Sequence, residues 1–399
     1  MSDAAAIGKD KGWRLILSSL TLAVSSTDTP SMVISICLVD VALAFGVSIG
    51  VAGQLRTVSS IASIVSALAM GVISLAYSHK AILTLGLLVN VLASLTCAFA
   101  PSLGLTMASL SATGLAVAMV TPMTDTYIGD IFQGERRSRA VGTVFALRTL
   151  SYLLAVQVIG LIAGLWGWQL VFLAFVAPYS LASLMLSAKA LPNASKSGSG
   201  NGRAGHLSGF KVVFSSRSAA SCLLGNTLAM AAWGGMITYV DSYLSERFLL
   251  PREQAALVLS GLALGVLVGS YAGGRLVNRY GRRALAAATL SIVGVLLMSL
   301  TNLPSLTLTL VITPFLSAIG GVRFTASNTL TLEQAAGVRG TMMSLNSAAL
   351  SLGWAIGSGV GGLALLLYGW RFVGISFGVM GIMAACIYQL LVQDSGRDS

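Results

Sequence analysis

The chain has 399 residues, of which 55% are hydrophobic and only 9% are charged. A water-soluble surface needs roughly 25–35% charged side chains, so this composition excludes an ordinary soluble domain. The formal net charge is +11. Such a charge would suit nucleic acid, but the placement of the basic residues has a different explanation.

Apolar stretches of membrane-spanning length recur along the whole chain. A span needs roughly 20 residues, and continuous apolar runs of that length predict helices because lipid does not tolerate unsatisfied backbone groups. The sequence therefore predicts an all-α integral membrane fold. The twelve expected helices lie at 15–41, 47–76, 81–100, 103–130, 140–165, 168–190, 217–244, 254–277, 284–302, 305–330, 341–367 and 370–392.

The basic residues are concentrated on alternate sides of these helices. With a cytoplasmic N-terminus, 18 of the 24 Lys and Arg lie in the N-terminal tail, the alternate loops and the C-terminal tail. This distribution follows the positive-inside rule. It predicts a multi-pass protein of the cell (inner or plasma) membrane with both termini in the cytoplasm, and it removes the need for a nucleic-acid partner.

Metal and catalytic chemistry have no basis in the sequence. The four cysteines are scattered singly through apolar segments, and His79 and His206 are the only histidines, both in expected loops. Neither pattern provides a zinc or redox site. With no nucleophile or paired carboxylates either, we expect no enzyme activity, no metal and no cofactor.

The chain divides into two halves that echo each other. Residues 193–209 form a Gly/Ser-rich polar tract, which predicts a flexible linker. The expected parts are an N-terminal six-helix bundle at 1–190, a cytoplasmic linker at 191–216 and a C-terminal six-helix bundle at 217–399. Several landmarks recur at an offset of 202 or 203 residues: Gly71 to Lys80 with Gly274 to Arg283, Arg137 with Arg339, and Gly167-Trp168 with Gly369-Trp370.

Three of these landmarks carry a family resemblance. The hairpin from Gly274 to Arg283, the segment from Asp130 to Arg139, and the Gly-Trp turns resemble loop motifs of the major facilitator superfamily, most of all its twelve-helix efflux-type branch of drug and sugar exporters. The resemblance implies the major facilitator fold, with two pseudo-symmetric six-helix bundles. It also implies a monomer in the lipid bilayer that moves a small organic solute by alternating access, with proton-coupled export.

One departure favours the general family over drug/proton antiport. The antiporter signature of the fifth helix, Gly-Pro followed two residues later by Gly-Gly, falls on Ala155-Val156 and Ile159-Gly160.

Proton coupling is expected at Asp28, in the polar run Ser25 to Ser31 of the first apolar segment. An ionisable group at that depth is costly unless it faces water or a partner. At about 1.5 Å rise per residue, Arg56 in the second helix lies at a depth that its long side chain could bridge. We therefore predict an Asp28/Arg56 pair that proton or substrate binding breaks. A static ion pair with no transport role is the alternative.

Further intramembrane polar residues are candidates for the substrate cavity. Asp125 and Arg148 share a depth near the inner side, where a structural ion pair and a gate are equally compatible with the sequence. Arg323 has no acidic partner on its own helix apart from Glu333. An arginine without a partner in a central cavity suggests an anionic substrate. The remaining cavity candidates, for each of which an ordinary helix contact is the alternative, are Ser26, Thr121, Asn226, Trp233, Tyr239 and Asn328.

Gating is expected from the two basic hairpins. By resemblance, they hold the inner face closed by pairing with Asp130, the acidic residue that ends the fourth helix. The hairpin residues concerned are His79, Lys80, Asn278, Arg279, Arg282 and Arg283.

Two other functions remain open from the sequence. An anion-selective symporter or exchanger would use the three intramembrane arginines, Arg56, Arg148 and Arg323. A non-transporting membrane receptor or scaffold would be compatible with the altered first hairpin, in which Leu75 and Ser78 replace the family's acidic residue and second glycine.

Overall fold

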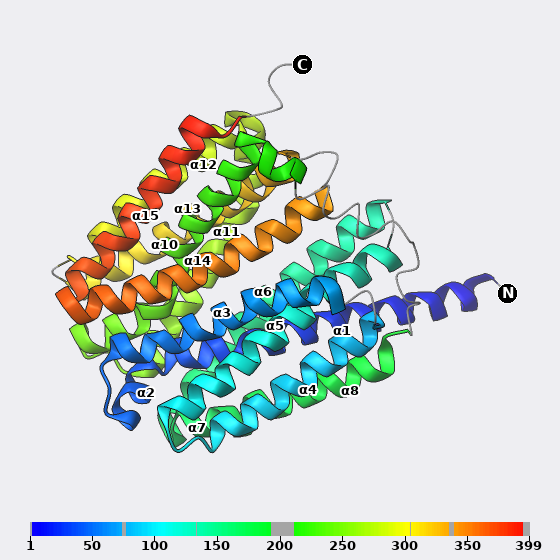
Figure 1. The fold of residues 1–399 in the computed structure, drawn as a ribbon, viewed down its shortest axis with the longest axis horizontal. Helices are drawn as coiled ribbons and strands as arrows, with labels where there is room; N and C mark the ends of the chain where they lie inside the picture. Colours follow the sequence, from blue (N-terminus) through cyan, green and yellow to red (C-terminus); the bar gives the residue numbers. More distant parts are fainter. Residues whose placement is uncertain are drawn as a thin grey trace. The chain divides into compact units, whose positions relative to one another are not determined.

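A computed structural model describes residues 2–73, 77–132, 134–192, 211–303, 305–334 and 339–393 (Figure 1). Within these ranges some side chains are not described: those of residues 2–12, 68, 71–73, 129–130, 134–139, 141–142, 145–146, 252–253, 256, 339–340 and 344.

The described residues form helices and contain no strand. Of the described helices, ten are long and apolar enough to cross a membrane, or eleven if the bent pair α1 and α2 is one span. The expected span at 47–76 corresponds to α3, whose final residues lack described side chains. The elements are α1 (Ser2–Ile36), α2 (Leu38–Phe45), α3 (Ile49–Ile73), α4 (His79–Ala98), α5 (Leu103–Ile131), α6 (Gly134–Trp166), α7 (Trp168–Val171), η1 (Phe172–Val176), α8 (Ala177–Ala190), α10 (Arg217–Phe248), α11 (Arg252–Tyr280), α12 (Arg282–Leu300), α13 (Leu306–Glu333), α14 (Arg339–Tyr368) and α15 (Trp370–Leu391).

The chain forms two compact units. Unit 1 contains Met1–Ile34 and Val58–Gly198, and unit 2 contains Ser35–Thr57 and Ser199–Ser399. The end of α1, all of α2 and the start of α3 thus group with the C-terminal helices, which the sequence did not predict. Residues 211–215, inside the expected linker, are helical. The expected bundle boundaries stay a prediction.

The internal repeat extends to the turns of the two units. Ser102 caps α5 by accepting a hydrogen bond from Leu105 N at 3.3 Å, and Ser305, 203 residues later, caps α13 through Leu308 N at the same distance. Gly167 and Gly369 have φ values of 88° and 76°. Glycine is the residue that adopts this backbone region without a steric penalty, which explains why both Gly-Trp turns contain it.

Two helices depart from regular α geometry. The first span is broken at Cys37, with a bend of 67° between its parts. Farther along, the π-helical segment η1 ends at Val176, two residues before Pro178. Proline has no N–H and its ring crowds the carbonyl four residues earlier, so a wider turn relieves the clash.

Each unit has its own apolar core, and close helix contacts in unit 2 depend on glycine. In unit 2, α11 packs on α13, α10 on α14 and α12 on α15 (Figure 1). A Cβ at Gly357 of α14 would lie 2.2 Å from the carbonyl oxygen of Ala231, and one at Gly353 would lie 2.5 Å from that of Thr227. Small residues therefore let α14 and α10 approach backbone to backbone, as in other membrane helix pairs.

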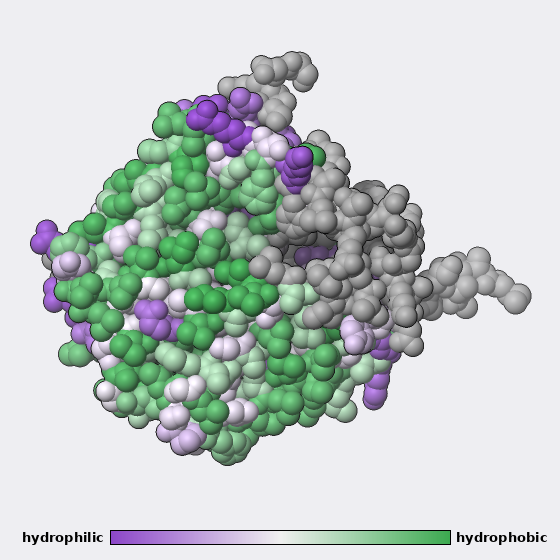
Figure 2. Space-filling view, viewed as in Figure 1, coloured by the Kyte–Doolittle hydropathy of each residue, from purple (hydrophilic) through white to green (hydrophobic). Residues whose placement is uncertain are grey.

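The surface matches the bilayer as solvent. The face in Figure 2 is mostly hydrophobic over the middle of the described helices, and hydrophilic residues gather near helix ends.

Each unit has two ends, which we name separately. The basic end of unit 1 is near residues 79–80, and that of unit 2 is near residues 279–283 and 333. The opposite end of unit 1 is near residues 99–102, and that of unit 2 is near residues 46–48 and 369.

Candidate functional site

The best-defined charged site lies in unit 1 and joins α1 to α6. The Nε and Nη2 atoms of Arg148 each lie 2.7 Å from Asp28 Oδ2. The side chains remain 42% and 24% exposed, respectively, so the pair is not sealed in the core. Charge-assisted hydrogen bonds of this kind are stronger than neutral ones, and these two fasten α6 to α1.

Other polar groups surround this pair. Asp125 of α5 is close enough to interact electrostatically with Arg148, while a direct ion pair or gate between the two stays a prediction. Thr121 lies one helical turn before Asp125. Tyr179 of α8 lies near Asp28 and was not predicted. Arg148 thus has two carboxylates within electrostatic reach, and Asp28 is the one it binds.

Ser26, a predicted cavity residue, is fully buried instead. Its hydroxyl donates to Ala23 O at 3.0 Å, and its carbonyl accepts a 3.1 Å bond from Asn90 Nδ2. Asn90 also donates to Ser180 Oγ at 2.8 Å. This asparagine of α4 fixes the polar turn of α1 next to Asp28. Its signal in the sequence was a single amide side chain within an apolar helix.

Asp28 binds Arg148 within unit 1, and the predicted Asp28/Arg56 pair, whose members belong to different units, stays a prediction. Arg56 belongs to unit 2, where its Nη1 donates to Ser35 Oγ at 3.4 Å and its Cζ lies 3.9 Å from the ring centre of Trp354. Depth along a helix could place both residues near the same level, but it could not give the direction in which each side chain points.

Arg56 belongs to a polar seam between α3 and α14, in the half of unit 2 that includes its opposite end. Thr57 and Ser358 hydroxyls lie 2.9 Å apart, and Tyr239 of α10 donates to Ser358 O at 2.8 Å. A Cβ at Gly53 would lie 1.8 Å from Tyr239 Oη. The Tyr239 hydroxyl is therefore packed inside this seam, and Tyr239, predicted to line a cavity, also lines the small apolar pocket described below.

Asn226 lies at the centre of a buried polar cluster in unit 2. Its Nδ2 donates to Thr331 Oγ1 at 2.9 Å and to Asn346 Oδ1 at 2.7 Å, while its Oδ1 accepts from Tyr388 at 2.6 Å. Four helices, α10, α13, α14 and α15, meet at these side chains. The amide is fully used in these bonds, so Asn226 holds helices together and is not an open cavity residue.

The other predicted cavity residues of unit 2 have different surroundings. Trp233 packs edge-on against Phe324, with ring centres 5.8 Å apart. Arg323 is 1% exposed, whereas Asn328 on the same helix is exposed. Trp233 and Arg323 therefore lie in the interior of unit 2, and Asn328 does not.

A second intramembrane carboxyl is buried in α10. Asp241 is 2% exposed, and its Oδ1 has no hydrogen-bond partner among the described residues. Buried carboxyl groups at membrane depth commonly take part in proton or ion pathways. Asp241 is therefore a second candidate proton acceptor, beside Asp28.

The gating residues of the first half can be placed only in part. His79, at the start of α4, is buried and meets the ring of Tyr127 edge-on, with ring centres 6.2 Å apart. Lys80 donates to Leu191 O at 2.8 Å. The side chain of Asp130 lies outside the described residues.

In the second half, one hairpin residue has an acidic partner other than the predicted Asp130. Arg282 binds Glu333, the last residue of α13. Arg283 donates to the carbonyl of Gln389, and Asn278 and Arg279 are exposed. The second basic hairpin is thus anchored within its own unit.

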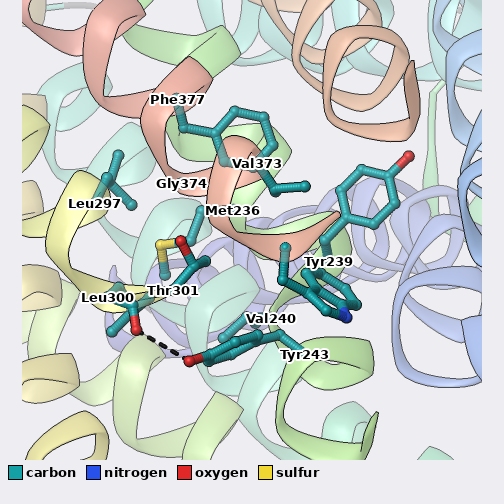
Figure 3. A pocket seen from close by; sticks show the side chains of 11 residues that line it. Met236, Tyr239, Val240, Tyr243, Leu297, Leu300, Thr301, Val373, Gly374 and Phe377 are labelled. Carbon is teal, nitrogen blue, oxygen red and sulfur yellow. Dashed lines mark hydrogen bonds between the residues drawn. The ribbon is translucent and has the colours of Figure 1, made fainter. Parts of the chain in front are cut away.

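A small apolar pocket lies between α10, α12 and α15 at the opposite end of unit 2 (Figure 3). Met236, Tyr243, Leu297 and Phe377 are among the residues that line it, and the Tyr243 hydroxyl donates to Leu300 O at 3.2 Å. Its lining offers no charged group among the described residues, so it differs in character from the Asp28/Arg148 site.

Comparison with known proteins gives relatives that are transporters. The chain is 22% identical over 363 residues to the uncharacterized MFS-type transporter YwfA of Bacillus subtilis (strain 168), and the match covers 90% of this chain and 88% of YwfA. It is 24% identical over 358 residues to YceJ of the same organism, another uncharacterized MFS-type transporter, with coverage of 89% and 90%.

Solved structures share the fold. A D-xylose-proton symporter superposes with a TM-score of 0.79 at 17% identity, covering 96% of this chain and 98% of the symporter. A bacterial homolog of the human lysosomal transporter Spinster, in an inward-facing and unoccupied conformation, gives 0.76 at 16%, with coverage of 94% and 96%. The family description Major Facilitator Superfamily matches residues 19–251 and 222–399. The chain thus belongs to the major facilitator superfamily, as a multi-pass membrane transporter of small molecules and not an enzyme.

Proposed function

We propose that this transporter couples the export of a small organic solute to protons, with Asp28 as the proton carrier and Arg148 as its partner. The observation that carries the proposal is the Asp28/Arg148 pair itself. It is a bidentate contact from arginine to one carboxylate oxygen, inside a polar turn of α1, with both side chains partly exposed. A pair that water can reach is able to exchange protons during a transport cycle.

The proposed switch follows from the charges. An ionised Asp28 holds Arg148 through two charge-assisted hydrogen bonds. Protonation removes the negative charge, so the carboxyl group no longer competes strongly for the guanidinium. Arg148 can then turn toward Asp125, its other electrostatic neighbour. Proton binding would thereby transfer the attachment of α6 from α1 to α5.

Alternating access needs a closure at the opposite end that can open. The seam of Thr57, Ser358 and Tyr239 supplies contacts suited to that role, because they are few, polar and spaced by glycines. Such contacts separate at lower cost than an interlocked apolar core. We place the basic end of each unit, with both chain termini, in the cytoplasm, on the basis of the positive-inside distribution.

The test is a proton-flux assay that works before the solute has been identified. Protein is reconstituted in liposomes containing a pH-sensitive dye, and a panel of sugars, amino acids, nucleosides and hydrophobic amines is added with and without an imposed pH gradient. We expect at least one solute to move protons in the wild type. Asp28→Asn should reduce gradient-driven flux to the level of empty liposomes, because it removes the proposed proton-binding group, while solute exchange without a gradient persists.

Asp241→Asn tests the competing candidate, since it removes the second carboxyl group within a membrane span that could accept a proton. It should leave coupling in place. Equal gradient-driven flux in the wild type and in Asp28→Asn would contradict the role of Asp28, and loss of coupling in Asp241→Asn alone would transfer that role to α10. Solute flux that ignores the pH gradient in every variant would exclude proton coupling altogether.

A further inference from the structure

Arg323 is a buried cation in the interior of unit 2. Its side chain is 1% exposed, and it is the largest fully buried side chain described. It lies ten residues before the end of α13 at Glu333, which corresponds to roughly 15 Å along the helix. A guanidinium removed from water at that depth needs hydrogen-bond acceptors or an opposite charge to offset its lost hydration.

The described neighbours of Arg323 do not supply that charge. The Phe324 ring centre lies 3.7 Å from its Cζ, and Tyr388 interacts with it electrostatically. The Tyr388 hydroxyl, however, donates its proton to Asn226 Oδ1. Arg323 Nη2 has no hydrogen-bond partner among the described residues. A strong donor therefore stays open in the core.

Some other basic side chains of the described residues have acceptors for their N–H groups, whereas Arg323 Nη2 has none. Arg148 binds Asp28, Arg282 binds Glu333, and Lys80 donates to the carbonyl of Leu191. Within the described part of the chain, Arg323 contacts no aspartate or glutamate. The position combines full burial with a charge that the described residues leave uncompensated.

We infer that Arg323 is the binding residue for a small monovalent anionic group, a carboxylate or a halide, in the interior of unit 2. The open Nη2 donor supplies a charge-assisted hydrogen bond to that group. Ser327 lies one turn farther along α13, buried beside Tyr388, and its hydroxyl offers a second donor on the same face. Phe324 covers one side of the guanidinium plane, which leaves its edge to the anion.

The inference deepens the proposed function by giving the ligand a negative charge. The anion site rests on the proposed transport function only if the bound anion is the transported solute. The anion itself could be a free ion that stays bound or the carboxylate of the solute, and the two sources share the same chemistry at Arg323.

Trp233 provides a built-in reporter for this position. Its indole packs edge-on against Phe324 at 5.8 Å, and a Cβ at Gly320 would meet its ring at 2.7 Å. An anion that binds Arg323 shifts the Phe324 ring stacked on it and so changes the fluorescence of Trp233.

The experiment measures anion binding directly. Purified full-length protein in nanodiscs is titrated with sodium chloride, acetate or benzoate up to about 100 mM, and thermal unfolding and tryptophan fluorescence are recorded. For a Kd of roughly 10 mM, we expect a saturable rise in Tm of roughly 2 °C. The rise should vanish in Arg323→Gln, persist in weakened form in Arg323→Lys, and remain intact in Arg275→Gln, which removes an exposed arginine of α11.

The unfolding temperature of Arg323→Gln without anion separates a loss of anion binding from a folding defect. Without added anion, Arg323→Gln should unfold at the same temperature as the wild type or higher, because it removes an uncompensated charge. Unfolding of Arg323→Gln at a markedly lower temperature would show that Arg323 is already satisfied, and would overturn the inference. A wild-type response that is unsaturable, or equal in Arg323→Gln, would overturn it as well.

Counterflow of radiolabelled acetate and benzoate in liposomes distinguishes the two sources. Flux that depends on Arg323 identifies the anion as cargo, whereas saturable binding without flux identifies a resident anion; either result supports the site. A wild-type protein that shows no Tm response while its proton-coupled flux is intact would reject the anion site and leave the role of Asp28 standing.

Discussion

Arg282 at the start of α12 binds Glu333 at the end of α13, and both residues have a counterpart 203 residues earlier in the chain, His79 and Asp130. The contact fastens the second basic hairpin to the helix that packs beside it. In the first half the same positions carry a histidine and an aspartate, so the repeat keeps an acidic residue at the end of the helix but replaces the arginine with a histidine.

The Arg282/Glu333 contact should contribute modestly to stability. The two side chains are 29% and 28% exposed, and partly exposed pairs are worth about 0.5–1 kcal/mol. Glu333→Arg should lower Tm by roughly 1–3 °C through repulsion of Arg282. The exchange of both residues, Arg282→Glu with Glu333→Arg, should restore most of that loss. A double variant no more stable than Glu333→Arg would show that the pair adds nothing beyond its separate residues.

The Asn226 cluster should contribute more to the free energy of unfolding than any single surface ion pair does. Asn226→Ala removes three buried hydrogen bonds, to Thr331, Asn346 and Tyr388. In membrane proteins such bonds average about 0.6 kcal/mol each, so the expected loss is about 2 kcal/mol. Thermal unfolding in detergent measures it. Asn328→Ala, at an exposed asparagine of α13, is the matched control and should leave Tm within error of the wild type.

The sequence predicted the helices well because their signal is local. Most described spans lie within a few residues of their apolar stretches, although α1 and α6 begin earlier, at Ser2 and Gly134, since the bilayer itself requires length and hydrophobicity. Turns were also accessible: Gly167 and Gly369, found as a repeated pair, both adopt positive φ. The break at Cys37 has no comparable signal, because Pro30, the obvious candidate for a kink, lies inside the continuous helix α1.

Side-chain partners were less predictable, because they depend on helix rotation and packing. Asp28 was identified as an intramembrane acid, but its partner Arg148 is 120 residues away on α6. Depth alone favoured Arg56, whose side chain contacts Ser35 and Trp354 within unit 2. Asn226 and Tyr239 are predicted from the sequence to line the substrate cavity, whereas their hydrogen bonds reach across α13, α14 and α15. The sequence contained no measure of which helices would meet there.

Two glycines of α11 should respond differently to the same substitution. A Cβ at Gly269 would lie 1.8 Å from the carbonyl oxygen of Ala318 on α13, whereas a Cβ at Gly274 would have no atom within 4 Å. Backbone atoms cannot turn aside as a flexible side chain can, so Gly269→Ala must push α11 and α13 apart. We expect a loss of about 1–3 kcal/mol. Gly274→Ala should be neutral or slightly stabilising, since alanine favours helices.

Thermal unfolding of the two alanine variants tests this packing. A distance of 1.8 Å from a Cβ at Gly269 to Ala318 O leaves no room for alanine. Similar Tm values for Gly269→Ala and the wild type would therefore mean that α11 and α13 lie farther apart than this distance implies. A fall in Tm for Gly274→Ala would instead point to a role of this glycine outside unit 2 packing.

The seam between α3 and α14 should have to open during transport, and a disulfide can test this. The hydroxyls of Thr57 and Ser358 lie 2.9 Å apart, which places the two side chains within disulfide reach. In a background with Cys37, Cys97, Cys222 and Cys386 replaced, Thr57→Cys with Ser358→Cys should crosslink on oxidation and reduce solute flux to near background. Reduction should restore it.

A second crosslink separates gating from a general loss of mobility. Ser19 and Ser187 hydroxyls lie 3.1 Å apart within unit 1, between α1 and α8. Because both of these side chains are fully buried in the core of unit 1, whereas Thr57 is partly exposed, Ser19→Cys with Ser187→Cys should crosslink equally well and leave flux largely intact. If the crosslinked Thr57/Ser358 variant transported at the wild-type rate, the seam would be a permanent contact, and the closure that alternates would have to lie elsewhere in the chain.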